Sequence, residues 1–166
     1  ELSKAIIPPL PGIASALGCI LADVRHDFIQ TLDRRLDELD VIDMYRVLAG
    51  HEEEGRKMLE REVLGGGSAS ATILNVEVRC HADMVYDGQI HEVLTSIPVS
   101  ICSVRELRCR FEDTYRRHYG DNLNTGPVRI RTLRTTVIGL RPKMEMPGGN
   151  TEGPSLLTAL KEKRPV

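Results

Sequence analysis

The order of the predicted elements indicates an α+β fold, in which helices pack against a mostly antiparallel sheet. Two β-like segments are separated by Asp87-Gly88, a dipeptide typical of hairpin turns. Two amphipathic helical patterns flank this hairpin along the chain. A last β-like run, residues 127–140, follows the second helical pattern. Strands and helices in this order predict two packed layers around one core.

The first thirty residues contain three short segments. A β-like run at residues 5–7 is cut off by the sequence Pro-Pro-Leu-Pro-Gly at residues 8–12. Residues 13–22 are small, apolar and uncharged, which predicts a helix that is buried on most of its sides. Residues 24–32 alternate in part between apolar and polar side chains and predict a strand.

A long helix is predicted from an N-cap at Asp43 to about residue 63. Its apolar stripe recurs at the helical period, and charged residues occupy the opposite side. The stripe comprises Met44, Val47, Leu48, His51, Gly55, Met58 and Leu59. The sequence Gly-Gly-Gly-Ser that follows lacks the lysine of a phosphate-binding loop and comes after a helix instead of before one, so a flexible linker is the favoured interpretation.

The second half of the chain alternates between strands and a helix. Residues 73–86 predict a strand, and residues 89–99 predict the strand that returns from the turn. Ser103 and Glu106 form a capping box, and the helix they begin ends before Gly120. Its predicted inner face comprises Val104, Leu107, Phe111, Tyr115 and His118. The tail from residue 142 is rich in proline, glycine and charge.

The composition excludes several classes of protein. With 166 residues, 41% hydrophobic and 28% charged, the chain is not expected to be disordered. Its 22 basic and 24 acidic residues argue against binding nucleic acid through overall positive charge. No apolar run reaches the roughly 18–20 residues of a membrane span, and no secretory signal opens the chain. Four cysteines without a Cys-x-x-Cys pair favour reduced thiols in a cytoplasmic protein over a disulfide framework.

The histidines do not compose a catalytic or metal-binding set. His26 and Asp27 are adjacent on a predicted strand and point to opposite faces, so structural hydrogen bonds are favoured over a shared site. His81 and His91 could face each other across the hairpin, with Asp83 and Glu92 nearby, as a metal site; surface polar residues are the favoured interpretation. The sequence alone therefore assigns neither catalytic residues nor a metal site.

Four stretches, in order, resemble one known family. The first is residues 6–18, Ile-Ile-Pro-Pro-Leu-Pro-Gly-Ile-Ala-Ser-Ala-Leu-Gly, continued by Leu-Ala-Asp-Val-Arg-His-Asp-Phe at 21–28. The second is Ala-Asp-Met-Val-Tyr-Asp-Gly-Gln at 82–89, and the others lie at 115–120 and 138–142. Together they resemble the ATP-hydrolysing hydantoinase A/5-oxoprolinase (N-methylhydantoinase) family over residues 5–143. Val85 and Asp121 depart from the family pattern.

The resemblance implies a carboxy-terminal part of a large subunit that uses ATP to open hydantoins or 5-oxoproline. ATP and magnesium are expected in the parent protein, and no cofactor is expected in the fragment alone, which would be inactive. The alternative is a non-catalytic assembly domain of a related ATP-dependent ketone carboxylase subunit. The resemblance implies that residues 1–32 are the end of an actin-like/sugar-kinase-like nucleotide-binding domain. It implies an amphipathic helical connection at residues 33–64, a Gly/Ser linker at 65–71, an α+β domain at 72–141 and an extended tail at 142–166.

Two sets of site residues follow from the resemblance. Gly12, Ser15 and Gly18 would lie close to the nucleotide, although close packing of a small-residue helix explains them equally well. Residues Tyr86, Gln89 and Glu92 would form an ordered polar cluster at a domain or subunit contact. The expected partner is a hydantoinase B-like subunit or domain in a homo- or hetero-oligomer, with neither nucleic acid nor membrane as a partner.

Overall fold

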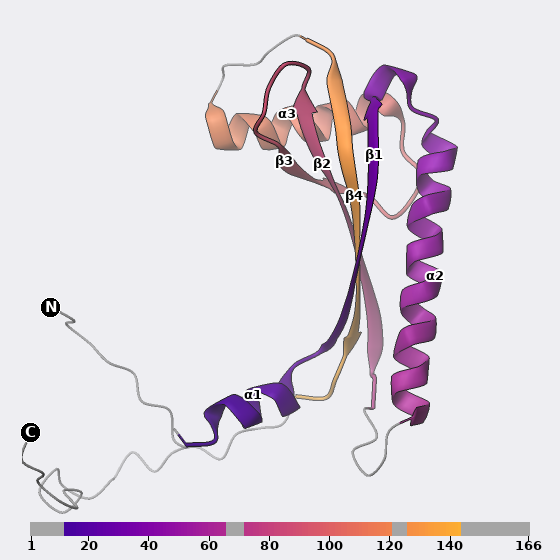
Figure 1. Cartoon of the computed structure of the whole chain (residues 1–166), viewed down its shortest axis with the longest axis vertical. Coiled ribbons are helices and arrows are strands. Elements are labelled where there is room, and N and C mark those ends of the chain that lie inside the picture. The colour runs from indigo at the N-terminus through magenta and orange to yellow at the C-terminus, as the bar shows by residue number, and fades with distance from the viewer. Residues whose placement is uncertain (1–11, 66–71, 121–125, 144–166) are drawn as a thin grey trace, which may run out of the picture. The chain divides into compact units, whose positions relative to one another are not determined.

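Four strands form one sheet in a computed structural model that describes residues 12–65, 72–120 and 126–143 (Figure 1). The order across the sheet is β1-β4-β2-β3, and each neighbouring pair is antiparallel. The strands are β1 (Val24–Arg35), β2 (Asn75–Tyr86), β3 (Val93–Ile97) and β4 (Val128–Leu140). The remaining elements of this part are the short 3-10 helix η1 (Leu36–Glu38) and the helices α2 (Val41–Gly65) and α3 (Val104–Tyr119). The predicted α+β fold is confirmed.

The chain divides into two compact units, and the larger one is Ala22–Pro142. Strand β1 pairs with β4 from Val24 onward, so residues 24–32 belong to the same sheet as the carboxy-terminal strands. Helix α1 (Ala14–Leu21) belongs to the smaller unit. In α1, residues 14–19 and Leu21 are half-buried or exposed, and Ile13 before the helix is 56% exposed, so the expectation of a helix buried on most sides is wrong for these residues.

The core lies between one face of the sheet and helices α2 and α3. In α3, Leu107, Phe111 and Tyr115 are buried as predicted. His118 is exposed, contrary to the prediction, because the last turn of α3 extends beyond the strands (Figure 1). Ser103 Oγ accepts a hydrogen bond from the amide of Glu106 at 3.2 Å, which confirms the cap.

Helix α2 buries the predicted stripe but begins earlier than predicted. The carboxylate of Asp40, and not that of Asp43, accepts hydrogen bonds from the amides of Ile42 and Asp43, at 2.8 and 3.3 Å. An aspartate placed one residue before the first helical residue satisfies these free amides. Gly55 lets the helix approach the sheet closely, because a Cβ there would lie 2.6 Å from a methyl carbon of Val137.

The connection between β2 and β3 is longer than the predicted hairpin. A turn does form at Asp87-Gly88: the amide of Gln89 donates to the carbonyl of Tyr86 at 3.0 Å, and Gly88 has φ of +88°. The return strand nevertheless begins only at Val93, opposite Met84, so residues 89–92 are not part of it. The last residues of β2, Val85 and Tyr86, pair with β4 and not with β3, so a tight hairpin does not join β2 to β3.

Three predicted segments lie outside the described residues: the run at 5–7, residues 66–71 of the linker and the tail beyond 143. Gly65 is the last residue of α2. Among the helices that the structure describes, none has both the length and the apolar character required to cross a bilayer.

Candidate functional site on the uncovered face of the sheet

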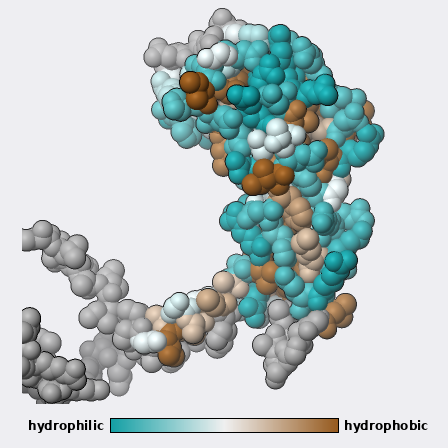
Figure 2. Space-filling model, viewed as in Figure 1, coloured by the Kyte–Doolittle hydropathy of each residue, from teal (hydrophilic) through white to brown (hydrophobic). Residues whose placement is uncertain are grey.

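Polar side chains gather on the sheet face opposite α2 and α3. Side chains alternate between the two faces of a strand, so the residues that do not join the core point to this face. They line an open hollow of about 480 Å3, which we call the face hollow. In Figure 1 the strands lie in front of α3, and in Figure 2 the same view is mainly hydrophilic with a few hydrophobic residues. The polar lining comprises Arg25, Asp27, Arg79, His81, Asp83, Arg134 and Thr136.

The carboxylates of the face hollow are held by arginines. Arg134 Nε donates to the nearly buried Asp83 at 2.7 Å, which ties the centre of β4 to β2. Arg25 donates to Asp27 at 2.8 Å, and the hydroxyl of Thr136 donates to the same carboxylate at 2.6 Å. These hydrogen bonds, first that of Arg25 and then that of Thr136, hold the pKa of Asp27 below its ordinary value.

Two kinds of titratable acid–base side chain line the face hollow, the carboxylates of Asp27 and Asp83 and the imidazole of His81. A carboxylate with a lowered pKa and an arginine partner is a poor proton acceptor near neutral pH. Burial lowers the pKa of His81, with a smaller contribution from Arg79 and an opposing one from Asp83. Among the residues that the structure describes, no three His, Cys, Asp or Glu side chains are arranged to hold a metal ion.

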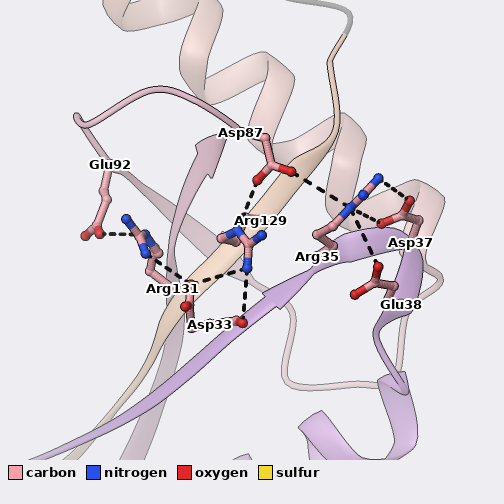
Figure 3. Close-up of polar contacts among 8 residues, drawn as sticks. All are labelled: Asp33, Arg35, Asp37, Glu38, Asp87, Glu92, Arg129 and Arg131. Carbon is pink, nitrogen blue, oxygen red and sulfur yellow. Dashed lines mark hydrogen bonds and ion pairs between the residues drawn. The ribbon is translucent and has the colours of Figure 1, made fainter.

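A second polar group, which we call the arginine network, lies where β1 ends and β4 begins (Figure 3). Arg129 Nε donates to Asp87 at 3.0 Å, and Arg129 also donates to the backbone carbonyl of Asp33 at 3.3 Å. Arg131 donates to the carboxylate of Asp33 at 3.1 Å and approaches Glu92 at 3.6 Å. Asp33 has φ of +45° at an irregularity in β1, which carries its carbonyl and carboxylate to these two arginines.

The arginine network joins three separate segments. Arg35 contacts Asp37 at 2.9 Å, and Glu38 and Asp87 at 3.9 Å each. Asp87 thus lies between an arginine of β1 and an arginine of β4 (Figure 3). The network fixes the turn after β2 against β1 and β4 and presents charge around it.

The structure brings two of the three predicted contact residues together, Tyr86 and Gln89, but not Glu92. Tyr86 is fully buried and packs edge-on against Phe111 and Tyr115, with ring centroids 4.9 and 5.1 Å apart. Gln89 Nε2 donates to the hydroxyl of Tyr115 at 3.1 Å. Glu92 instead faces Arg131. The three residues are therefore not one polar cluster, although the connection that carries Gln89 and Glu92 is anchored at both of them.

The three predicted nucleotide-proximal residues lie on or just before α1. Gly12, Ser15 and Gly18 are all exposed. A Cβ at Gly12 or Gly18 would meet nothing within 4 Å, so close packing within the described chain does not explain these glycines.

The histidines described here lie apart from one another and have different contacts. His26 Nε2 lies 3.3 Å from Glu62 on α2, whereas Asp27 points to the face hollow, as their adjacency predicted. His51 stacks on Phe28 in the layer between helix and sheet. His81 pairs in register with Ser96, not with His91, because β3 begins after residue 91.

Sequence analysis missed the arginines of β4. Arg129, Arg131 and Arg134 stand on a strand otherwise rich in apolar and threonine residues. The spacing of Arg129 and Arg131 was a usable signal, because charged residues at alternate strand positions mark a face without a covering helix; Arg134 falls out of this alternation by one residue. Their carboxylate partners could not be identified, since Asp33 and Asp87 lie 98 and 42 residues away from the arginines they bind.

Comparison with known proteins gives relatives in sequence and in structure. No model of a known protein family matches the chain. The chain is 30% identical over 146 residues to an uncharacterized protein of Methanocaldococcus jannaschii, a match that covers 88% of this chain and 19% of that protein. It is 28% identical over 153 residues to the alpha subunit of caprolactamase from Pseudomonas jessenii, covering 87% of this chain and 21% of the subunit.

Two solved structures share the fold. The crystal structure of the ATP-dependent caprolactamase from Pseudomonas jessenii matches with a TM-score of 0.62 and 25% identity, over 84% of this chain and 21% of that one. Nucleotide-free acetone carboxylase matches with a TM-score of 0.52 and 21% identity, over 80% of this chain and 20% of that one. At this level of identity the match shows a shared fold alone. The chain spans about a fifth of the length of these relatives. The matches agree with the resemblance found in the sequence at the level of this group of ATP-dependent enzymes, not at the level of hydantoinase A itself.

Proposed function

We propose that this chain is the carboxy-terminal part of the large subunit of a cytoplasmic, ATP-dependent enzyme that opens cyclic amides, with hydantoins or 5-oxoproline as substrates. The observation that carries the proposal is the sequence similarity to the alpha subunit of caprolactamase, an enzyme named for a cyclic amide, over nearly all of this chain. The shared fold supports it. The choice of hydantoins or 5-oxoproline as substrates rests in addition on the family resemblance of residues 6–28 and 82–89.

In the proposed reaction, ATP and magnesium are bound by the remainder of the large subunit. Transfer of the terminal phosphoryl group to the amide oxygen would make the ring carbon electrophilic. Water then adds to that carbon and the C–N bond breaks, which frees the ring nitrogen and leaves an acyl phosphate. A second water hydrolyses the acyl phosphate to the carboxylate and inorganic phosphate. Gly12, Ser15 and Gly18, exposed at the start of the described chain, are proposed to lie near the nucleotide when the rest of that domain is present.

The unit Ala22–Pro142 is proposed to act in assembly. Its face hollow and arginine network supply paired charges and no poised base, which suits a contact surface with a hydantoinase B-like subunit. Gln89 and Glu92, anchored by Tyr115 and Arg131, are proposed to lie at the edge of this contact, and buried Tyr86 to support them from below.

The experiment is a substrate survey on the assembled enzyme. The complete large subunit that contains this sequence is coexpressed with the B-like subunit, and phosphate release is measured with hydantoin, 5-oxoproline, caprolactam, or acetone plus bicarbonate. Release that depends on hydantoin or 5-oxoproline, with a ring-opened product, supports the proposal. Release that depends on acetone and bicarbonate would instead support the alternative, an assembly domain of a ketone carboxylase. No release with any of the cyclic amides contradicts the proposal.

A further inference from the structure

Strand β2 is longer than the strand beside it. β3 pairs with β2 only from Cys80 to Met84, whereas β4 pairs with β2 along its whole length from Asn75 to Tyr86. In the ranges 12–65, 72–120 and 126–143, no strand pairs with the other side of residues 75–79. A row of strand amides and carbonyls without a neighbour is a template for another strand.

The backbone groups at this free edge can be assigned. The amide of Val76 donates to the side-chain oxygen of Asn75 at 2.9 Å instead of to β4. Backbone groups alternate between the two edges of a strand, so Val76 and Val78 direct their amides and carbonyls to the free edge. Cys80, two residues further, follows the same alternation and pairs with Ile97 of β3. Asn75 therefore occupies one position that a neighbouring strand would fill.

Two apolar hollows of about 350 Å3 each accompany this edge on the helix side. The ion pair of Glu52 with Arg56, at 2.8 Å, separates them, because Glu52 lines the first hollow and Arg56 the second. The apolar lining of the first includes Ile42, Tyr45, Ala49, Cys80, Val99 and Ile101. That of the second comprises Leu59, Val63, Leu64, Ile73 and Val76.

The hollows expose large side chains. Ile101 is 69% exposed and Leu64 is 86% exposed. A stable protein contact buries about 600–1,000 Å2 on each partner, which is more than five paired strand residues supply alone. The occupant must therefore also place apolar side chains over the hollows, at the positions opposite Val76 and Val78, whose side chains face α2.

The charged side chains beside the edge define the other two positions of the strand that would bind there. Glu77 and Arg79 point to the uncovered face and form an ion pair with each other at 2.8 Å, with side chains 42% and 56% exposed. A neighbouring strand is most stable with opposite charges directly across. In an antiparallel strand, the residue opposite Arg79 comes first and is acidic, and the residue opposite Glu77 is basic. The complementary order is acidic, apolar, basic, apolar.

A second copy of β2 has this order but does not fit. Residues 77–80 read Glu-Val-Arg-Cys, so Glu77 could face Arg79 of another copy. That register places Val76 of one copy beside Cys80 of the other, where Ile97 already pairs. If each of the two strands is shifted by one residue, Glu77 of one copy lies opposite Glu77 of the other, and the like charges repel each other. A strand of a different polypeptide whose first paired residue lies opposite Arg79 meets neither obstacle.

We propose that the free edge of β2 at residues 75–79 binds an extended strand of a partner protein, antiparallel to β2 and in line with β3, with the order acidic, apolar, basic, apolar. The added strand exchanges backbone hydrogen bonds with Val76 and Val78 and displaces the side chain of Asn75 from the amide it holds. This binding mode does not depend on the ATP-dependent activity proposed above.

The probe is the fluorescently labelled peptide Glu-Ile-Lys-Leu-Thr, titrated with the 166-residue chain and followed by fluorescence anisotropy. In the proposed register the amides of its Ile and Leu point to β2, and those of its Lys and Thr point away. N-methylation at Ile and Leu is expected to weaken binding about tenfold or more, and N-methylation at Lys and Thr to change it less than about twofold. Absence of binding, or equal loss for both methylated peptides, overturns the proposal.

Variants of the chain test the side-chain positions. The double change Glu77→Arg with Arg79→Glu is expected to reverse the preference in favour of Lys-Ile-Glu-Leu-Thr. Ile101→Asp, in the first hollow, is expected to weaken binding. Ile90→Asp is the control, because Ile90 is also a strongly exposed isoleucine, at 86%, but lies on the connection after β2, and this change is expected to leave binding unchanged. Self-association of the chain that the peptide competes away would identify a second copy as the occupant and overturn the proposal.

Discussion

Neighbouring residues on α3 have opposite environments, because the helix turns one side to the core. Phe111 is fully buried between Tyr86 and Tyr115, whereas Cys109, two residues earlier, is exposed. The 100° rotation per residue separates them although they are close in sequence. Helical periodicity alone was sufficient to predict this difference.

We expect Phe111→Ala to lower the free energy of unfolding by about 3–5 kcal/mol, because it removes a buried aromatic ring and leaves a cavity. Cys109→Ser, as the matched control on the same helix, is expected to change it by less than about 0.5 kcal/mol. Urea denaturation followed by circular dichroism measures both. A larger loss for the cysteine variant would mean that the faces of α3 are assigned the wrong way round.

His51 links stability to pH. Burial lowers the pKa of its imidazole, which stacks on Phe28 and lies 3.2 Å from the hydroxyl of Thr135; Glu54 opposes this shift more weakly. The unfolded chain therefore binds a proton more readily than the folded one, so the free energy of unfolding is expected to fall as pH drops below about 6.5, the ordinary histidine value.

The measurement is the urea midpoint between pH 8 and pH 5 for the native chain and for His51→Gln. The variant cannot titrate at this position, so its midpoint is expected to fall less steeply over the same range. His81, whose pKa burial also lowers, remains in both proteins and contributes equally to both curves. Parallel curves for the two proteins would show that His51 does not carry this dependence.

At the scale of elements, helix α2 is positioned by one glycine. Gly55 and Gly50 both lie inside α2, but a Cβ at Gly55 would overlap Val137 and approach Phe28 at 3.1 Å, whereas one at Gly50 would meet nothing within 4 Å. At an interior position of a helix, alanine is more stabilising than glycine by about 0.5–1 kcal/mol where there is space for its methyl group. The two positions therefore separate helix propensity from packing.

We expect Gly50→Ala to stabilise the protein by about 0.5–1 kcal/mol, and Gly55→Ala to destabilise it by about 1–2 kcal/mol, because overpacking exceeds the gain in propensity. Thermal unfolding of both variants beside the native chain provides the comparison. Stabilisation by both substitutions would indicate that α2 lies further from β4 than the structure places it.

Element prediction from the sequence was accurate for several elements that follow a local rule, although the cap signal at Asp43 gave the wrong first residue of α2. The apolar stripe of α2, the capping box at Ser103 and the strand at 127–140 each follow from period or cap chemistry. The register between β2 and β3 could not be predicted, because it depends on how far β4 extends beside β2. The same holds for Asp33: no local pattern indicates that its backbone takes a positive φ to meet two arginines of β4.

The connection between β2 and β3 is the element expected to act in assembly. Gln89→Ala removes the hydrogen bond to Tyr115 that holds this connection against α3. We expect the variant large subunit to bind the B-like subunit more weakly, while turnover of the complex that does form stays unchanged. Ser96→Ala, an exposed change on β3, is the control. Sedimentation velocity gives the assembly and phosphate release the turnover; normal assembly with abolished turnover would assign Gln89 to the chemistry instead.

At the scale of the whole molecule, the two polar sites of the described chain consist of charged side chains that are paired with one another. Phosphoryl transfer requires groups that cradle phosphates, carboxylates that hold magnesium, and a positioned nucleophile. In the face hollow and the arginine network the carboxylates already accept hydrogen bonds or ion pairs from arginines. A catalytic magnesium site at these residues would require breaking several such pairs together.

We therefore expect the 166-residue chain alone neither to hydrolyse ATP nor to open a hydantoin, whereas the complete large subunit with its partner does both. The chain spans about a fifth of the relatives it matches, and one exposed helix, α1, carries the residues proposed to lie near the nucleotide. A single helix offers no enclosed cleft in which water is excluded from a reacting phosphate. Calorimetric titration with magnesium–ATP and a phosphate-release assay on the purified chain test this directly, with the complete enzyme as positive control. Micromolar nucleotide binding or steady turnover by the chain alone would place the nucleotide site within these 166 residues and contradict the assembly role proposed for Ala22–Pro142.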